Sequence, residues 1–263
     1  MVNNVLEISN LSLPFAFKEL KLSFKENTIT AISGPNNCGK TTLIKILSGI
    51  IFTSDTVFLF SKDLSSYKQA ELSKIISEII PGMSNFNFQS LSEGLDYLIY
   101  KKIIKKNDEF LSKIIKDFKL TKILSKEFKE LSIKDQIKVM LAFTIIKRNK
   151  ILILDDILRY FKDKEKKELI DILLKYKESE KLTIIMTISN LEDCLFCDYL
   201  YIIDKNNVVL KGAPLDVLEK DNILNKLGLD LPFILDLSVK LRDYDLISNL
   251  ELEQERLVNK LWN

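Results

Sequence analysis

One short stretch of this 263-residue sequence, SGPNNCGKTT at positions 33–42, has residue types suited to holding phosphate. A glycine is followed by four residues and then by Gly39, Lys40 and Thr41. In this pattern the backbone N–H groups wrap a phosphate, the lysine reaches the outer phosphates of a nucleotide, and the threonine hydroxyl takes one position around Mg²⁺. The predicted nucleotide-binding residues of the loop are Gly34, Asn36, Asn37, Cys38, Gly39, Lys40, Thr41 and Thr42.

The residues on either side of this stretch support the interpretation. An apolar run at 28–32 reads as a strand, and residues 43–47 have the apolar spacing of a helix. A strand, a loop and a helix in this order are the setting of a P-loop. Asn37 stands where a further glycine is common, and asparagine tolerates a positive φ, so we expect the loop to form. A glycine-rich turn with a purely structural role is the alternative.

Two adjacent acids, Asp155 and Asp156, end an apolar run that begins at Ile151. In P-loop nucleoside triphosphatases (NTPases), four apolar residues and an aspartate place a carboxylate in the Mg²⁺ shell. Asp155 fits that role, and with Thr41 it forms the predicted metal site. Asp156 stands where a carboxylate would activate water, which makes it a candidate catalytic residue. The alternative is two acids that end a strand without a chemical role.

Composition and charge exclude several classes of function. The formal charge is +2 and the pI about 8.2, a balance that does not indicate nucleic acid as a partner. The sequence has neither a bilayer-length apolar run nor the features of a signal peptide, so we expect a cytoplasmic protein. Cys194 and Cys197 form a CxxC pair that we expect to pack on a helix without zinc. The chain contains no histidine, which excludes an imidazole base.

Short β-like runs alternate with helical stretches along the chain. The expected strands are residues 5–8, 20–24, 57–60, 75–80, 151–155 and 182–187, with a hairpin formed by 199–204 and 208–211. Helical patterns dominate from about 91 to 147. Buried strands that alternate with helices predict a mostly parallel α/β sheet, and the middle helices predict an inserted helical subdomain.

A further segment, KELSIKDQ at residues 129–136, lies shortly before the strand that ends at Asp155. It resembles the signature Leu-Ser-Gly-Gly-Gln of the ABC (ATP-binding cassette) ATPases, which stands at this distance from the second acid motif. Residues 201–214 resemble the family's closing hairpin with its Gly-x-Pro exit, and Phe15 matches the aromatic that stacks on adenine. The resemblance implies that the signature would contact the nucleotide of a partner subunit through Leu131, Ser132, Ile133, Lys134 and Asp135.

The resemblance extends from about residue 6 to residue 218 and implies the architecture. We expect an α/β P-loop NTPase of ATP-binding cassette type: a mostly parallel sheet, an antiparallel β subdomain, a helical subdomain and a small C-terminal helical appendage. The expected division is a cassette at 1–220, with the helical subdomain at about 82–148, and a C-terminal extension at 221–263.

The C-terminal extension indicates which members of the ABC family the chain resembles most. Residues 227–242 resemble the extension of the ATPase subunits of energy-coupling factor (ECF) transporters. In those transporters two ATPases sit under a transmembrane scaffold protein, and a small membrane subunit captures vitamins or nickel and cobalt ions. Phe233, Leu237 and Leu241 recur every four residues and would form one apolar stripe. The stripe would pack either on a partner ATPase or on the chain's own core.

Several family positions carry other residues in this chain. Asp156 stands in place of the water-polarising glutamate and is one methylene shorter, and Ser189 stands in place of the switch histidine. The glutamine that links nucleotide to the membrane partner falls on Pro81, or on Gly82 with a one-residue slip. Ile133-Lys134-Asp135 replaces Gly-Gly-Gln in the signature. We therefore expect ATP and Mg²⁺ binding to be kept and hydrolysis to be impaired.

The sequence thus predicts the ATP-binding subunit of an ABC transporter, of ECF type, at the cytoplasmic face of the cell membrane. It would act as the degenerate half of a heterodimeric ATPase pair. The alternatives are a nucleotide-dependent structural or regulatory protein that never turns over, and an ATPase of another ABC importer class. A single cassette without a basic patch disfavours action on nucleic acid. The transported substrate is not encoded here, because its selection would lie in a membrane subunit.

Overall fold

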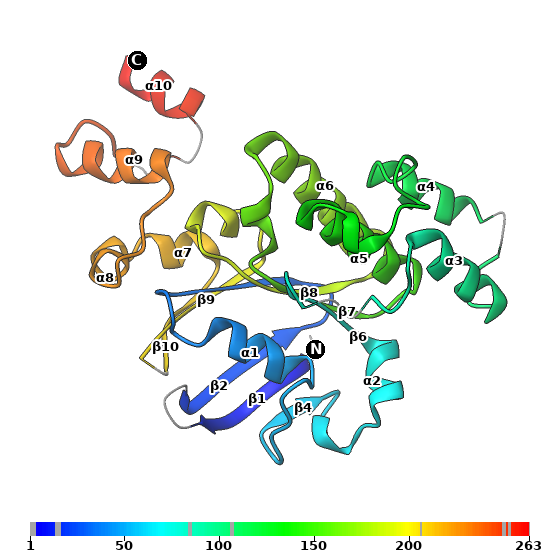
Figure 1. Ribbon diagram of the computed structural model, residues 1–263. Coiled ribbons are helices and arrows are strands. Elements are labelled where there is room, and N and C mark those ends of the chain that lie inside the picture. The colour runs from blue at the N-terminus through cyan, green and yellow to red at the C-terminus, as the bar shows by residue number, and fades with distance from the viewer. Residues whose placement is uncertain are drawn as a thin grey trace.

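A six-stranded sheet forms the centre of the computed structural model, and helices cover both of its faces (Figure 1). The structure describes residues 4–13, 17–83, 86–105, 108–205, 207–248, 251 and 254–262. The strand order is β10-β9-β3-β8-β7-β6, parallel except for the edge strand β10. The strands are β3 (Ile29–Ser33), β6 (Ile76–Ile79), β7 (Ile151–Asp155), β8 (Thr183–Thr187), β9 (Tyr199–Asp204) and β10 (Asn207–Gly212).

A second sheet of four antiparallel strands lies below the first, with the order β2-β1-β4-β5. Its strands are β1 (Asn4–Leu13), β2 (Phe17–Lys25), β4 (Val57–Leu59) and β5 (Lys62–Asp63). Helix α1 (Lys40–Leu47) lies between the two sheets and buries Leu43, Ile44, Ile46 and Leu47 in the core that they share. Both predicted sheets, the parallel and the antiparallel one, are therefore present.

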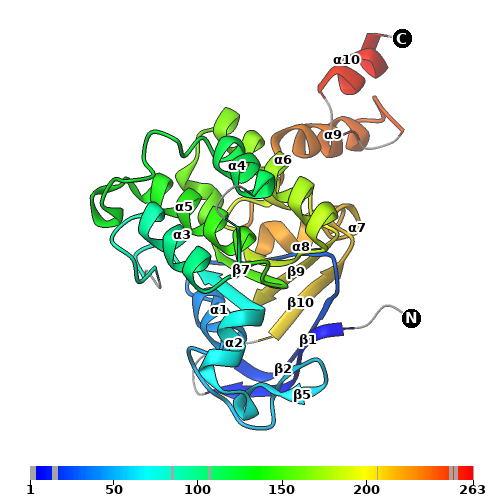
Figure 2. The ribbon, with the colours of Figure 1, turned by 90° about the vertical axis from the view of Figure 1, so that its right-hand side faces the viewer.

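Three helices from the middle of the chain cover the other face of the large sheet, together with a long helix that follows β7 (Figure 2). They are α3 (Leu91–Tyr100), α4 (Glu109–Asp117), α5 (Ile133–Ile146) and α6 (Asp163–Glu180). Helix α2 (Gln69–Ile75) leads into the edge strand β6. All five residues of β7 and of β8 are buried, because helices cover them on both faces. This explains the uninterrupted apolar runs of these two strands.

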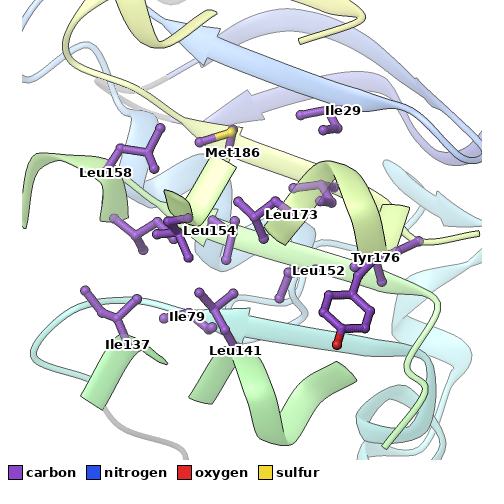
Figure 3. Packing of buried hydrophobic residues seen from close by; sticks show 14 of the residues in the cluster. Ile29, Ile79, Ile137, Leu141, Leu152, Leu154, Leu158, Leu173, Tyr176 and Met186 are labelled. Atoms are coloured by element: carbon purple, nitrogen blue, oxygen red, sulfur yellow. The ribbon is translucent and has the colours of Figure 1, made fainter. Parts of the chain in front are cut away.

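Close packing on this face fixes α5 and α6 against the sheet (Figure 3). Ile137 and Leu141 of α5 lie over Ile79 and Leu154, and Leu173 of α6 packs in the same cluster. These side chains are almost completely buried. The positions of the residues at the strand ends therefore depend on this packing.

Four short helices form the C-terminal part, α7 (Pro214–Leu218), α8 (Asp221–Lys226), α9 (Phe233–Asp243) and α10 (Gln254–Trp262). In both ribbon views α9 and α10 project away from the sheets (Figures 1 and 2). Helix α9 buries Leu235 and Val239, whereas Phe233 is 71% and Leu237 36% exposed. Phe233 therefore does not pack on the chain's own core, whereas Leu237 is partly covered by it. Among the described helices, none is long and apolar enough to cross a membrane.

The core packing predicts a large effect for Leu173→Ala. Leu173 has no exposed surface, and Leu→Ala at such sites costs about 2–5 kcal/mol of the free energy of unfolding. Urea denaturation measures the loss. Leu174→Ala, at the half-buried neighbouring position, is the matched control and should lose clearly less. Equal losses for both variants would contradict the packing described here.

Candidate nucleotide site

The predicted P-loop connects β3 to α1 and adopts a conformation that needs its unusual residues. Gly39 immediately before α1 has φ 97°, and Asn37 has φ 63°, the left-handed region that asparagine tolerates. Gly34 allows a close approach of backbone: a Cβ there would lie 2.1 Å from the carbonyl oxygen of Ile203 in β9. Any side chain at position 34 would therefore displace the loop from the sheet.

The N-terminus of α1 is arranged to receive an anion. No side chain caps it, and its first turn contains no acidic residue. Its free N–H groups and the positive end of the helix dipole both favour a bound phosphate. The Lys40 ammonium folds back over the loop and donates to the carbonyl oxygens of Gly34 (2.6 Å) and Pro35 (2.8 Å). A positive charge thus lies at the mouth of the loop.

Cys38 is half-buried inside the same loop. Its Sγ lies 3.8 Å from the Lys40 ammonium, and burial raises the pKa of the thiol above its usual value. Burial outweighs the opposing effect of the lysine charge, so the thiol stays protonated at neutral pH. The Cys38 side chain thus contributes packing rather than charge to the loop.

Oxygen atoms from two motifs meet beside the loop, as the sequence predicted for Thr41 and Asp155. The Thr41 hydroxyl donates to Asp155 Oδ2 at 2.8 Å, although the two residues are far apart in the sequence. A hydroxyl and a carboxylate are hard oxygen ligands, which suit Mg²⁺. The residues present therefore fit a magnesium ion bound together with nucleotide phosphates.

Thr187, at the end of β8, positions both acids, and the sequence analysis missed it. The parallel pairing of β7 and β8 puts Thr187 opposite Asp155. The Thr187 hydroxyl donates to Asp155 Oδ1 (2.7 Å) and accepts from the backbone N–H of Asp156 (2.9 Å). A polar residue at the end of the neighbouring buried strand was the available signal.

Asp156 and Ser189 lie in direct contact. The Ser189 hydroxyl is 2.8 Å from Oδ1 and 2.7 Å from Oδ2 of Asp156, and its backbone N–H donates to Oδ1 at 3.1 Å. Asp156 has φ 47°, a left-handed conformation that turns its side chain toward the loop after β8. The shortest contacts of this carboxylate are therefore with a neutral serine. Arg159, which the sequence analysis also missed, lies 3.4 Å from Asp156 Oδ2.

The signature segment is closed by its own residues. Ser132 caps α5: its hydroxyl accepts from the backbone N–H of Asp135 (3.2 Å) and donates to the Asp135 carboxylate (2.8 Å). The Lys134 ammonium contacts Glu165 of α6 at 2.5 Å, and this bond lowers the pKa of the Glu165 carboxyl. The hydroxyl and the cation that would meet a partner's phosphate are thus already engaged.

The structure places the signature and the P-loop on opposite faces of the large sheet. Helix α5 packs in the core on one face and α1 in the core on the other. The signature residues Leu131–Asp135 and the loop residues Gly34–Thr42 are therefore two separate surfaces of one chain. Phe15, the candidate for adenine stacking, lies outside the described residues.

Pro81 and Gly82 line a cavity of about 670 Å³ between the end of β6 and α5. Phe86, Phe128 and Met140 form its apolar wall. A neighbouring cavity of about 950 Å³ shares Phe86 and Met140 and extends toward α2. Pro81 or Gly82 thus stands in place of the family's glutamine that links the nucleotide to the membrane partner.

With this geometry established, comparison with known proteins assigns the family. Residues 17–159, more than half of the 263-residue chain, match the ABC transporter family. The chain belongs to the ABC transporter family. It is an ATP-binding subunit of an ABC transporter, and it is most like the energy-coupling factor transporter ATPases.

Two ABC relatives illustrate the likeness. The energy-coupling factor transporter ATP-binding protein EcfA1 of Mycoplasma mobile is 24% identical over 94% of this chain and 90% of its own length. EcfA1 of Lactobacillus delbrueckii subsp. bulgaricus is 21% identical over 100% of this chain and 98% of its own length. These matches include the C-terminal part, as the sequence analysis expected.

Solved structures show the same ABC fold. CbiO1 of Clostridium perfringens, part of the ABC transporter complex cbiONQ, superposes with a TM-score of 0.68 at 22% identity, over 87% of this chain and 96% of its own. A bacterial Atm1-family ABC exporter with ATP bound superposes with a TM-score of 0.72 at 16% identity, over 87% of this chain and 42% of its own. The predicted fold class is therefore confirmed.

Thr187→Val tests the positions of the two acids in this ABC subunit. Valine keeps the shape of threonine but loses both hydrogen bonds, and it leaves the N–H of Asp156 without its partner. We expect a loss of about 1–3 kcal/mol in the free energy of unfolding. Thr187→Ser, which keeps the hydroxyl, should lose less. Greater stability of Thr187→Val than of Thr187→Ser would contradict this role.

Proposed function

We propose that this ABC subunit is the ATPase of an ECF-type importer and that it acts as the weaker half of a heterodimeric ATPase pair. One observation carries the proposal. Thr41 and Asp155, the groups suited to bind the metal, are in contact beside the P-loop, whereas the two positions that would act on water carry Asp156 and Ser189. Binding without efficient turnover is the function that these residues favour.

Mg·ATP binding is assigned to the P-loop and β7. The free N–H groups at the start of α1 and the Lys40 ammonium would hold the phosphates, and Thr41 and Asp155 would hold the magnesium ion. The ion supplies charge neutralisation for the phosphates when it is bound. Gly34, Asn37 and Gly39 would keep the loop open for this ligand. The remaining expected contacts are those of Asn36, Cys38 and Thr42 with the phosphates and of Phe15 with adenine.

Slow hydrolysis follows from the contact between Asp156 and Ser189. Both oxygens of the carboxylate face the serine hydroxyl, so a water molecule must compete with Ser189 for the Asp156 carboxylate. The side chain is also one methylene shorter than glutamate. A misplacement of about 1 Å in a reacting group can cost roughly a hundredfold in rate.

The closed signature favours pairing with a different ATPase, one whose motifs are less altered. A homodimer would combine the Asp156–Ser189 site with the Ser132–Asp135 contact at both nucleotides. A partner with an intact signature would complete the nucleotide site of this chain. The exposed apolar residues Phe233 and Leu237 of α9 offer such a partner a contact surface.

A transmembrane scaffold subunit is the proposed partner for the cavities beside Pro81 and Gly82. The first cavity has a mixed polar and apolar wall, whereas the second is mainly apolar, and Tyr97 and Ile103 remain about half exposed at the edge of the second. Apolar surface of this kind marks protein–protein contact sites. The subunit would thus lie at the cytoplasmic face of the cell membrane, with vitamins or nickel and cobalt ions as the transported class. The proposed division is a cassette at 1–220, with its helical subdomain at about 82–148, and an extension at 221–263.

A second candidate function is a regulatory subunit that binds ATP, clamps a partner and never turns over. The Ser189–Asp156 contact favours it over an active ATPase. Purification from native membranes separates the two functions. A multispanning membrane protein and a second ATPase should co-purify with an importer subunit, and the absence of both would contradict the proposed transport function.

The P-loop assignment predicts that Mg·ATP stabilises the chain. A ligand that binds only the folded state adds about 2.7 kcal/mol at a hundredfold excess over its Kd. A thermal-shift assay should show this for the wild type and for Lys45→Ala, a control at the other end of α1. Lys40→Ala should abolish the shift. The assignment fails if the wild type shows no shift with Mg·ATP.

The heterodimer assignment predicts that Phe233→Ser with Leu237→Ser weakens pairing with the co-purifying ATPase. Both side chains are exposed in the single chain, so its melting temperature should change little. Burial of each in an interface is worth about 1.5–3 kcal/mol, so the Kd should rise at least about tenfold. Leu215→Ser, 48% exposed on α7, is the control. An unchanged Kd of the double variant, measured by light scattering, would exclude α9 from the interface.

A further inference from the structure

We propose that Arg159 binds the γ-phosphate of the nucleotide held by this chain's own P-loop, as the cation that the switch position lacks. This inference rests on the proposed function, because it needs ATP at the P-loop. Arg159 belongs to the short 3₁₀ helix η3 (Ile157–Tyr160), which begins directly after Asp156.

The position of Arg159 follows from its contact with Asp156. Its guanidinium Nη1 lies 3.4 Å from Asp156 Oδ2. Asp156 directly follows Asp155, whose carboxylate contacts Thr41 at the start of α1. The guanidinium therefore contacts the carboxylate of Asp156, which would lie beside the γ-phosphate.

The charges at the site create a need for this cation. Asp155 and Asp156 contribute two negative charges, and a nucleotide adds more. Asp155 would be neutralised by the magnesium ion and Lys40 would serve the loop, but Asp156 would repel the γ-phosphate beside it, and its side-chain contacts are the neutral Ser189 and the guanidinium of Arg159. The chain contains no histidine that could supply the charge. Arg159 offsets this repulsion.

Arg159 is free to make the new contact. Its side chain is 64% exposed, against 18% for that of Asp156, and 3.4 Å is long for a charged hydrogen bond. Exposed pairs of this kind are weak, so little is lost when the guanidinium turns toward another anion. The Tyr160 ring lies 5.8 Å from the guanidinium and supports it on one side. The planar fork of an arginine fits two phosphate oxygens at once.

A purely structural role is the competing explanation, in which Arg159 only pairs with Asp156. The two roles differ in what they do to ATP and ADP. A contact with the γ-phosphate strengthens ATP binding and leaves ADP binding unchanged. A structural role changes both affinities together, or neither.

Calorimetric titration of the full-length chain with Mg·ATP and with Mg·ADP tests the proposal. Arg159→Gln should weaken ATP binding by about ten- to a hundredfold, the value of a charged hydrogen bond, and change ADP binding less than about twofold. The ATP affinity of Arg159→Lys, which keeps the charge but not the planar guanidinium, should fall between those of the wild type and Arg159→Gln. Arg148→Gln is the matched control: the side chain is 63% exposed and pairs with Glu180 at 4.0 Å, at the far end of α5.

Three results would overturn the proposal. An ATP affinity of Arg159→Gln equal to that of the wild type excludes a γ-phosphate contact while leaving the P-loop assignment intact. Equal losses for ATP and ADP indicate the structural role. Wild-type chain that binds neither nucleotide would overturn the proposed function, and the role of Arg159 with it.

Discussion

The parallel pairing of β7 with β8 is the constraint on which the site depends. It sets Thr187 opposite Asp155, and one threonine hydroxyl then fixes the carboxylate of Asp155 and the backbone of Asp156. Both strands are buried on both faces, so a slip of one residue would disturb the close packing on both sides and move Asp155 away from Thr187. The positions of Asp155 and Asp156 are thus fixed by core packing rather than by the loop that follows them.

Two helix N-termini in this chain have opposite electrostatic character. Helix α1 begins without a capping side chain or an acid and leaves its N–H groups open for phosphate. Helix α5 begins with Ser132 and Asp135, which satisfy one another and add a negative charge where a partner's phosphate would arrive. This contrast favours the proposal that the chain holds its own nucleotide and contacts that of a partner less well.

Much of the fold and part of the site could be predicted from the sequence. The loop at Gly34–Thr41 and the acids after β7 follow from local patterns: apolar runs of strand length and a spacing that only a few turns permit. The position of Thr187 at a strand end was visible in the sequence, but its contacts with both acids and the contact of Arg159 with Asp156 were not, because they depend on strand register and on the left-handed backbone of Asp156. The apolar stripe of α9 was readable from its spacing. Its exposure was not, because the helix packs through Leu235 and Val239 on another side.

We infer that this chain holds ATP but turns it over slowly, because Asp156 is short and bound by Ser189. The direct test is the rate of ATP hydrolysis in the assembled complex, with the P-loop of the partner ATPase disabled so that only the nucleotide held by this chain is hydrolysed. We predict a wild-type rate well below the ordinary ~1–10 s⁻¹ and a gain of at least about tenfold in the double variant Asp156→Glu with Ser189→His. A wild-type rate in that ordinary range, with no gain in the variant, would contradict the account.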